Sequence, residues 1–182
     1  MPKKYRRKYY REYNIYKIMR NYFKAKLDYL IRIKYTQSSL MFIEWSTNAK
    51  PIADLLNACK DWDYYKRLFH SFKLTGMALE ISPGIPQGNF VSNGAVVLGV
   101  ITSGDPTDFS TVVDSTKSIV LSPTNTQRRY ISFNGGQVGW SSTNLIGSID
   151  GKLFCETDSL PESGVMVWGV KLSFYVTFKN NS

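Results

Sequence analysis

The chain has 182 residues, 43% of them apolar, which suits one folded domain with a sizeable core. Its net charge of +9 is unevenly placed, because residues 1–26 hold ten Lys and Arg against one Glu, whereas residues 27–182 hold thirteen basic and thirteen acidic side chains. Such a separate basic segment predicts a polyanionic partner. No apolar run reaches the roughly 18 residues of a membrane-spanning helix, so we expect no membrane insertion.

The basic segment 1–26 is also rich in tyrosine. Four of its tyrosines, Tyr5, Tyr9, Tyr13 and Tyr16, recur at helical spacing, and both a helical and a disordered arm fit this composition. No apolar stretch of a secretory signal follows the basic start, so we expect the chain to be made and used inside a cell.

The arm supplies most of the candidate nucleic-acid ligands. Its cations would neutralise phosphates, and its tyrosines would stack on unpaired bases. These candidates are Lys3, Lys4, Arg6, Arg7, Lys8, Tyr9, Tyr10, Arg11, Tyr13, Lys17 and Arg20. Because no pattern suited to base edges is visible, we expect sequence-tolerant binding. The same residues would also serve as a nuclear import signal.

From residue 27 the apolar pattern changes to a period of two. Apolar and polar side chains alternate from Leu27 to Thr36, which predicts a half-buried strand, and the apolar run Leu40–Trp45 predicts a more buried one. Segment 51–69 is the one helical interlude, and its spacing predicts two short helices.

A strand is predicted next from Phe72 to Ile81. Its apolar phase slips by one residue at Gly76, which predicts a glycine bulge. The closely spaced Pro83, Gly84 and Pro86 are expected to end this strand.

The rest of the chain consists of short strands separated by turn residues. They are predicted at 95–102, 110–113, 118–121, 129–133, 148–157 and, most clearly, 166–178. The last has seven alternating apolar side chains, which predict a long central strand with one buried face. About eight strands without alternating helices predict an all-β sandwich or barrel at 27–182, preceded by the arm at 1–26.

The remaining reactive side chains favour no enzyme and no cofactor. The sole histidine, His70, lies in an aromatic stretch where a packed or hydrogen-bonded ring is expected rather than a catalytic one. Asp61 and Asp63 are expected at a helix start rather than in a metal site, and Cys59 and Cys155 as reduced, packed thiols. We therefore expect no catalytic residue and no metal ligand.

One basic pair in the body, Arg128–Arg129, joins the candidate nucleic-acid ligands. Contact with nucleic acid, contact with an acidic neighbour across a subunit interface, and a simple exposed strand end all fit this pair.

Four segments together resemble the capsid proteins of small circular, replication-initiator-encoding single-stranded DNA viruses, the circovirus-like group. They are the terminal MPKKYRRKYYREY, the segment DWDYYKRLFHSFKLTGMALEISPG, the stretch SPTNTQRRYISF and the closing GVKLSFYVTFKN. In the second, Phe72 replaces the tyrosine usual in the family. The four occur in the family's order and span nearly the whole chain.

The resemblance implies an eight-stranded antiparallel jelly-roll sandwich with a short helical insertion. It further implies a homo-oligomeric icosahedral shell of the smallest kind, T=1, which packages a circular single-stranded DNA genome with the arm inside. The protein would then be found in the virion and, during assembly, in the host nucleus or cytoplasm. The host receptor is not specified by these motifs.

Two other classes fit the composition. One is a non-viral nucleic-acid-binding β-barrel protein, and the other is a lectin-like or receptor-binding jelly roll whose arm touches a membrane surface. A coat protein predicts closed shells, whereas the membrane-binding alternative predicts binding to anionic vesicles without nucleic acid.

Overall fold

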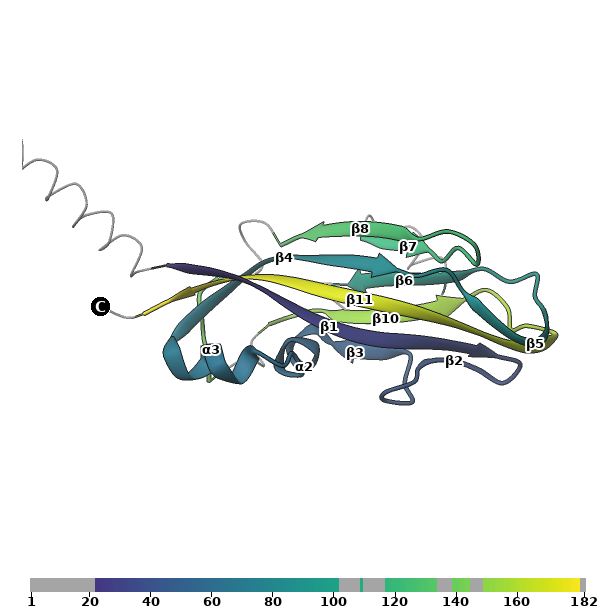
Figure 1. Ribbon diagram of the computed structural model, residues 1–182, viewed down its shortest axis with the longest axis horizontal. Helices are drawn as coiled ribbons and strands as arrows, with labels where there is room; N and C mark the ends of the chain where they lie inside the picture. Colours follow the sequence, from purple (N-terminus) through teal and green to yellow (C-terminus); the bar gives the residue numbers. More distant parts are fainter. Residues whose placement is uncertain (1–21, 102–108, 110–116, 134–138, 145–148, 181–182) are drawn as a thin grey trace, which may run out of the picture.

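A computed structural model describes residues 22–101, 109, 117–133, 139–144 and 149–180, and shows two antiparallel sheets packed face to face (Figure 1). The main path of the larger sheet is β2 (Ser39–Phe42), β1 (Phe23–Thr36), β11 (Ser163–Lys179), β4 (Ser71–Ile81) and β8 (Gln127–Ser132). Beside it, β5 (Ile85–Val91) pairs with β11, and β9 (Ser141–Ser142) pairs with β4. The smaller sheet has the order β3 (Ala49–Pro51), β10 (Lys152–Thr157), β6 (Val96–Ile101) and β7 (Ser118–Val120).

The order in which the chain visits the two sheets defines a jelly roll. It passes from β1 to β3 in the other sheet, back to β4, across to β6 and β7, back to β8, across to β10 and finally to β11. The first and last strands, β1 and β11, pair along their whole common length, from Phe23 opposite Phe178 to Thr36 opposite Val165. The eight principal strands thus confirm the predicted antiparallel jelly-roll sandwich.

The central strand β11 carries the core of the larger sheet. Its seven alternating apolar residues, Met166, Trp168, Val170, Leu172, Phe174, Val176 and Phe178, are all at most 5% exposed. They pack in one cluster with residues of the smaller sheet such as Leu98 and Leu153. The prediction of a long central strand with one buried face is therefore confirmed.

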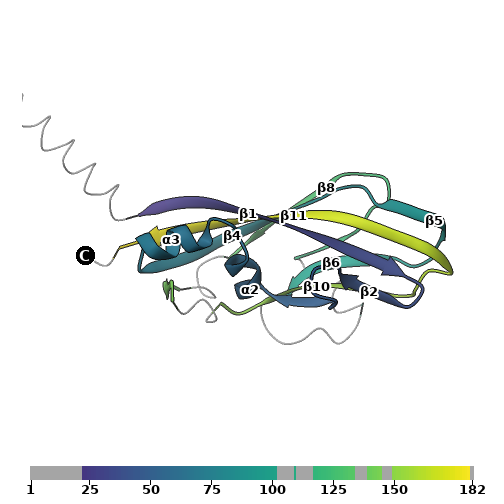
Figure 2. The same ribbon diagram turned by 60° about the horizontal axis from the view of Figure 1, so that its bottom comes forward.

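Two short helices, α2 (Ile52–Asn57) and α3 (Trp62–Leu68), form the predicted helical insertion. Both views place α3 near the end of the sandwich where β1 begins and β11 ends (Figures 1 and 2). The fully buried Trp62 packs edge-on against Phe72 of β4, with ring centroids 5.0 Å apart. Asp61 stands at the start of α3 as expected, although its side chain makes no capping hydrogen bond.

Neither helix is long and apolar enough to cross a membrane.

The strand boundaries differ from the sequence predictions at several points. β1 begins at Phe23, earlier than the strand predicted from Leu27. The predicted irregularity at Gly76 is confirmed, because the register of β4 against β11 shifts there. β4 does end at Ile81, but an unpredicted strand, β5, starts at Ile85. The strand predicted at 110–113 lies outside the described residues.

Candidate nucleic-acid interface

The larger sheet turns a basic surface away from the core. Alternation sends every second side chain of β1, β11, β4 and β8 to this side, which we call the basic face. The strand register places its cations there, and they are Lys24, Lys26, Arg32, Lys34, Lys73, Arg128, Lys171 and Lys179. The carboxylates that pair with some of them are Asp28, Glu44 and Glu80. Cations outnumber these carboxylates, so the face is positively charged.

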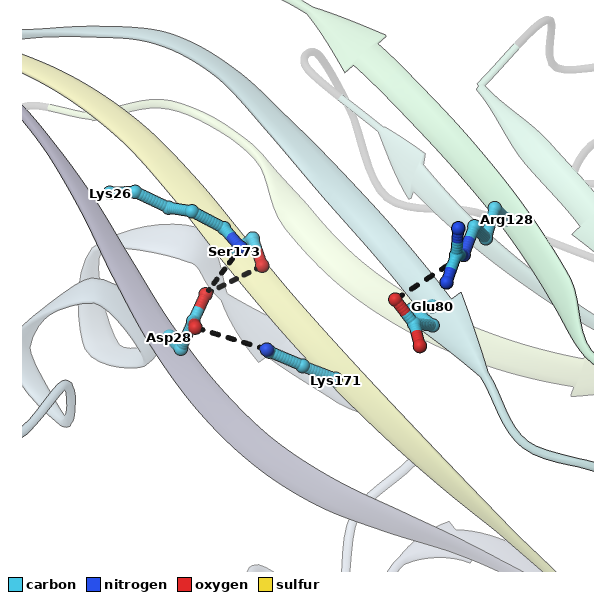
Figure 3. Close-up of polar contacts among 6 residues, drawn as sticks. All are labelled: Lys26, Asp28, Glu80, Arg128, Lys171 and Ser173. Atoms are coloured by element: carbon cyan, nitrogen blue, oxygen red, sulfur yellow. Dashed lines mark hydrogen bonds and ion pairs between the residues drawn. The ribbon is translucent and has the colours of Figure 1, made fainter.

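Asp28 fixes two of the lysines on this face (Figure 3). Its carboxylate lies 3.1 Å from the Lys171 ammonium and 3.5 Å from that of Lys26, and it accepts a 2.6 Å hydrogen bond from the Ser173 hydroxyl. Burial, the largest influence, favours the neutral acid, but the hydroxyl and the two ammonium groups together favour the carboxylate more. The pKa of Asp28 is therefore lowered from its ordinary value. The cluster as a whole keeps a surplus positive charge.

A second ion pair joins β8 to β4 on the same face. The Nε atom of Arg128 lies 3.3 Å from a carboxylate oxygen of Glu80 (Figure 3). The Arg128 side chain is 75% exposed, and ion pairs in water hold their partners weakly. The guanidinium therefore remains accessible to a further anion such as a phosphate.

The basic face contains two adjoining hollows. One, of about 500 Å³, lies over β11, β4 and β8 and is lined by Lys26, Arg128, Arg129, Tyr130 and Tyr175 among others. The other, of about 460 Å³, lies over Gly169 of β11, where the missing side chain leaves room. Glu80 lines both hollows, so they meet at its side chain.

The smaller sheet presents a different outer side. There Val97 of β6 and Phe154 of β10 are almost fully buried in a second apolar cluster, against which Ala49, Ile101 and Phe109 pack. An apolar cluster covered by its own chain offers little to a polyanion. Of the two outer sheet faces, the basic face is therefore the better surface for nucleic acid.

The structure places one of the predicted ligands on the basic face. Arg128 points outward there, whereas Arg129 pairs in register with the core residue Leu79, so alternation turns its side chain to the other side of the sheet, although the residue borders the same hollow. The predicted ligands from Lys3 to Arg20 lie outside the described residues.

Sequence reasoning missed much of the basic face. Lys26, Lys171, Tyr130 and Tyr175 were not among the candidate ligands, although each occupies an outward position of a strand. A second adjacent basic pair, Lys66–Arg67 in the last turn of α3, was also overlooked. The signal was the polar half of the period-two pattern, which becomes a surface only once the strands are placed side by side.

The remaining reactive residues fall as follows. Both thiols are free and buried, as predicted, and burial raises the pKa of Cys59 to about 12 and that of Cys155 further. The expected packing of the His70 ring is wrong, because this residue is exposed. It precedes β4, so the strand alternation that buries Phe72 does not extend to it. Among the described residues no group of three or more potential metal ligands occurs.

Comparisons with known proteins bear on the fold. No protein-family model and no curated protein matches the sequence. The structure of cocksfoot mottle virus matches at a TM-score of 0.62 and 10% identity, covering 89% of this chain and 97% of that one. The decameric BFDV capsid protein matches at a TM-score of 0.50 and 15% identity, and the match covers 88% of this chain and 100% of that one. The semi-empty virus-like particle of the giant freshwater prawn (Macrobrachium rosenbergii) nodavirus matches at a TM-score of 0.55 and 13% identity, and the match covers 88% of this chain and 97% of that one.

The chain has the jelly-roll fold of viral capsid proteins. The match covers nearly all of each of these three chains, so the resemblance extends to the whole sandwich rather than to one sheet.

Proposed function

We propose that the chain is a viral coat protein that assembles with itself into a closed shell and packages nucleic acid. The observation that carries this proposal is a capsid-type jelly roll whose larger sheet has a positively charged outer face, preceded in the sequence by a basic segment. The arm joins the sheet at Phe23, directly before the outward cations Lys24 and Lys26. On this proposal, the arm and the basic face both offer positive charge to a polyanion inside a shell.

More specifically, we propose that the shell has T=1 symmetry and encloses a circular single-stranded DNA genome. This assignment is supported by the four sequence segments that resemble circovirus-like capsid proteins. On this proposal the protein resides in the virion and passes through the host nucleus or cytoplasm during assembly. The sequence predicted an arm at 1–26 and a shell domain at 27–182; because β1 begins at Phe23, we propose that residues 23–26 belong to the shell domain.

Binding by such a surface is electrostatic. Each phosphate that a Lys or Arg neutralises releases counterions, so the logarithm of the binding constant falls linearly with the logarithm of salt concentration, with a slope of about −0.7 per phosphate on single strands. Tyrosine side chains add stacking on exposed bases, which depends little on sequence or salt. The proposal therefore predicts binding that is sensitive to salt and tolerant of sequence.

Imaging of the purified full chain tests the shell. Size-exclusion chromatography followed by electron microscopy should reveal closed, uniform particles whose 260/280 nm absorbance ratio indicates nucleic acid. Nucleic-acid binding without shells would favour the non-viral β-barrel alternative. Binding to anionic vesicles without nucleic acid would instead favour the membrane-touching jelly roll.

A truncation tests the arm. Deleting residues 2–21 leaves β1 intact, so the circular dichroism spectrum should keep its β-sheet signal while copurifying nucleic acid is strongly reduced. A matched full-length variant with the arm cations changed to Gln separates charge from length and should show the same loss. Truncated protein that still copurifies with the wild-type amount of nucleic acid would contradict the role of the arm.

Smaller changes within the arm separate charge from stacking. Changing Arg6, Arg7 and Lys8 to Gln should flatten the salt slope for every DNA sequence alike. Changing Tyr9 and Tyr10 to Ala should weaken binding and keep the slope. Fluorescence anisotropy on oligo-dT and mixed-sequence oligomers across a salt series measures both, and salt-insensitive or strongly sequence-dependent binding would overturn the electrostatic mechanism.

A further inference from the structure

Tyr130 occupies an unusual position in the larger hollow of the basic face. Its ring lies on β4 directly over Gly76, so that a Cβ atom added to Gly76 would come within 2.7 Å of the ring carbon Cζ and would also overlap the hydroxyl oxygen. Only glycine leaves room for a ring in this place. The backbone of β4 thus covers part of the underside of Tyr130, yet the residue is still 57% exposed.

A second tyrosine supports the first from the side. Tyr175 of β11 is the cross-strand neighbour of Gly76, and its ring meets that of Tyr130 nearly edge-on, at 5.7 Å between centroids and 62° between planes. This contact, together with Gly76 beneath, restricts how the Tyr130 ring can tilt. Tyr130 therefore presents its ring to solvent, with Tyr175 packed beside it.

Cations surround this aromatic surface. Lys26 and Arg128 line the same hollow as the two tyrosines. Glu80 pairs with Arg128, and Asp28 is shared between Lys26 and the adjoining Lys171, so three cations face two carboxylates around the hollow. The hollow thus combines an exposed aromatic face with surplus positive charge at its rim, which is the combination that single-stranded nucleic-acid sites use.

We propose that this hollow binds one unpaired nucleotide of the packaged strand, with its base stacked on the open face of Tyr130 and a flanking phosphate paired with Lys26 or Arg128. The proposal rests on the proposed packaging function and adds a site in the folded body to the arm. Because every base has a flat face, the site accepts any of the four. Gly76 is a positioning residue here, since it lets the ring lie against the sheet.

The test measures binding of the full chain to fluorescein-labelled oligo-dT and to an oligomer of the same length made of abasic nucleotides. A base stack contributes about 1–3 kcal/mol, so Tyr130→Ala should weaken oligo-dT binding roughly 5- to 150-fold. The same variant should bind the abasic oligomer as the wild type does, because only the base contact is lost. Tyr130→Phe keeps the ring and should bind both oligomers normally.

Two further variants sharpen the result. Tyr64→Ala removes a similarly exposed tyrosine, 63% exposed on α3, and should leave oligo-dT binding unchanged. Gly76→Ala keeps Tyr130 but displaces its ring, and should lower oligo-dT binding while sparing the abasic oligomer. Circular dichroism of each variant establishes that it is folded.

The outcomes distinguish this site from the wider function. If the wild type binds oligo-dT but Tyr130→Ala binds it equally well, the nucleotide site is wrong and the coat-protein proposal stands. Equal losses on oligo-dT and on the abasic oligomer would also overturn the stacking role. If the wild type binds neither oligomer, both proposals fail. As a second measurement, photocrosslinking of a 5-bromouracil-substituted oligomer should label the segment 127–133 that contains Tyr130, and labelling confined to other segments would contradict the site.

Discussion

Replacing Phe174 with alanine removes an aromatic ring at the centre of the larger sheet. Phe174 is 0% exposed and lies between Leu27 on β1 and Met77 on β4, its partners in the strand register. Burying such a side chain contributes roughly 1.5–3 kcal/mol, and the cavity left in a close-packed core adds a further cost. The total loss should be about 3–5 kcal/mol. Domains are stable by only about 5–15 kcal/mol, so this is a large share.

Urea unfolding followed by tryptophan fluorescence measures the loss, with the buried Trp168 of the same strand as a reporter. The matched control is Leu30→Ala on β1, which truncates a side chain that is 70% exposed and should change stability by no more than about 0.5 kcal/mol. Protein concentration and salt are held constant, because assembly would stabilise the folded chain. Equal urea midpoints for Phe174→Ala and Leu30→Ala would show that the burial argument is wrong.

Three further measurements test other features of the chain. Because folding lowers the pKa of Asp28, its carboxylate stabilises the folded chain at pH values above its unfolded pKa of about 3.8. This stabilisation is lost as the pH falls through the lower pKa of the folded state. The urea midpoints of wild type and Asp28→Asn should therefore converge as the pH falls below about 3.8. Cys59 and Cys155 should react with a thiol reagent only after unfolding, and a fast reaction of the native chain would contradict their burial. Gly164 and Gly88 both have φ near +70°, but only a Cβ atom added at Gly164 would overlap the backbone of β5. Gly164→Ala should therefore lower the urea midpoint of unfolding more than Gly88→Ala does. Equal decreases of the two midpoints would contradict this overlap.

The sequence predicted best those elements whose periodicity is long and regular. The alternation from Leu27 to Thr36 and from Met166 to Phe178 corresponds to β1 and β11, and the helical spacing at 51–69 corresponds to α2 and α3. In each case burial of one face requires the pattern, so the pattern reveals the element. Local periodicity does not say which strands pair, and the pairing of the first strand with the last was not predicted from the sequence.

The elements that were missed lack such a pattern. β5 has a proline and a glycine and is exposed along nearly its whole length, so burial imposes no alternation on it. Its pairing with β11 comes from tertiary structure instead.

The candidate site was harder to predict than the fold for a related reason. The hollow with Tyr130 is assembled from β1, β11, β4 and β8, which lie far apart in the sequence. Only the register places Lys26 opposite Tyr175, and Tyr175 opposite Gly76. Considered singly, each of these residues is an ordinary outward position of a strand.

The same alternation separates stability from binding along β11. Leu172 and Phe174 point into the core, whereas Lys171, Ser173 and Tyr175 belong to the opposite side and take part in the basic face. A substitution at an inward position therefore acts on the fold, and one at Lys171 or Tyr175 acts on the charge or the aromatic surface offered to nucleic acid. Since these positions differ by one residue, neighbouring single substitutions on one strand can distinguish a chain that fails to fold from one that folds but does not bind nucleic acid.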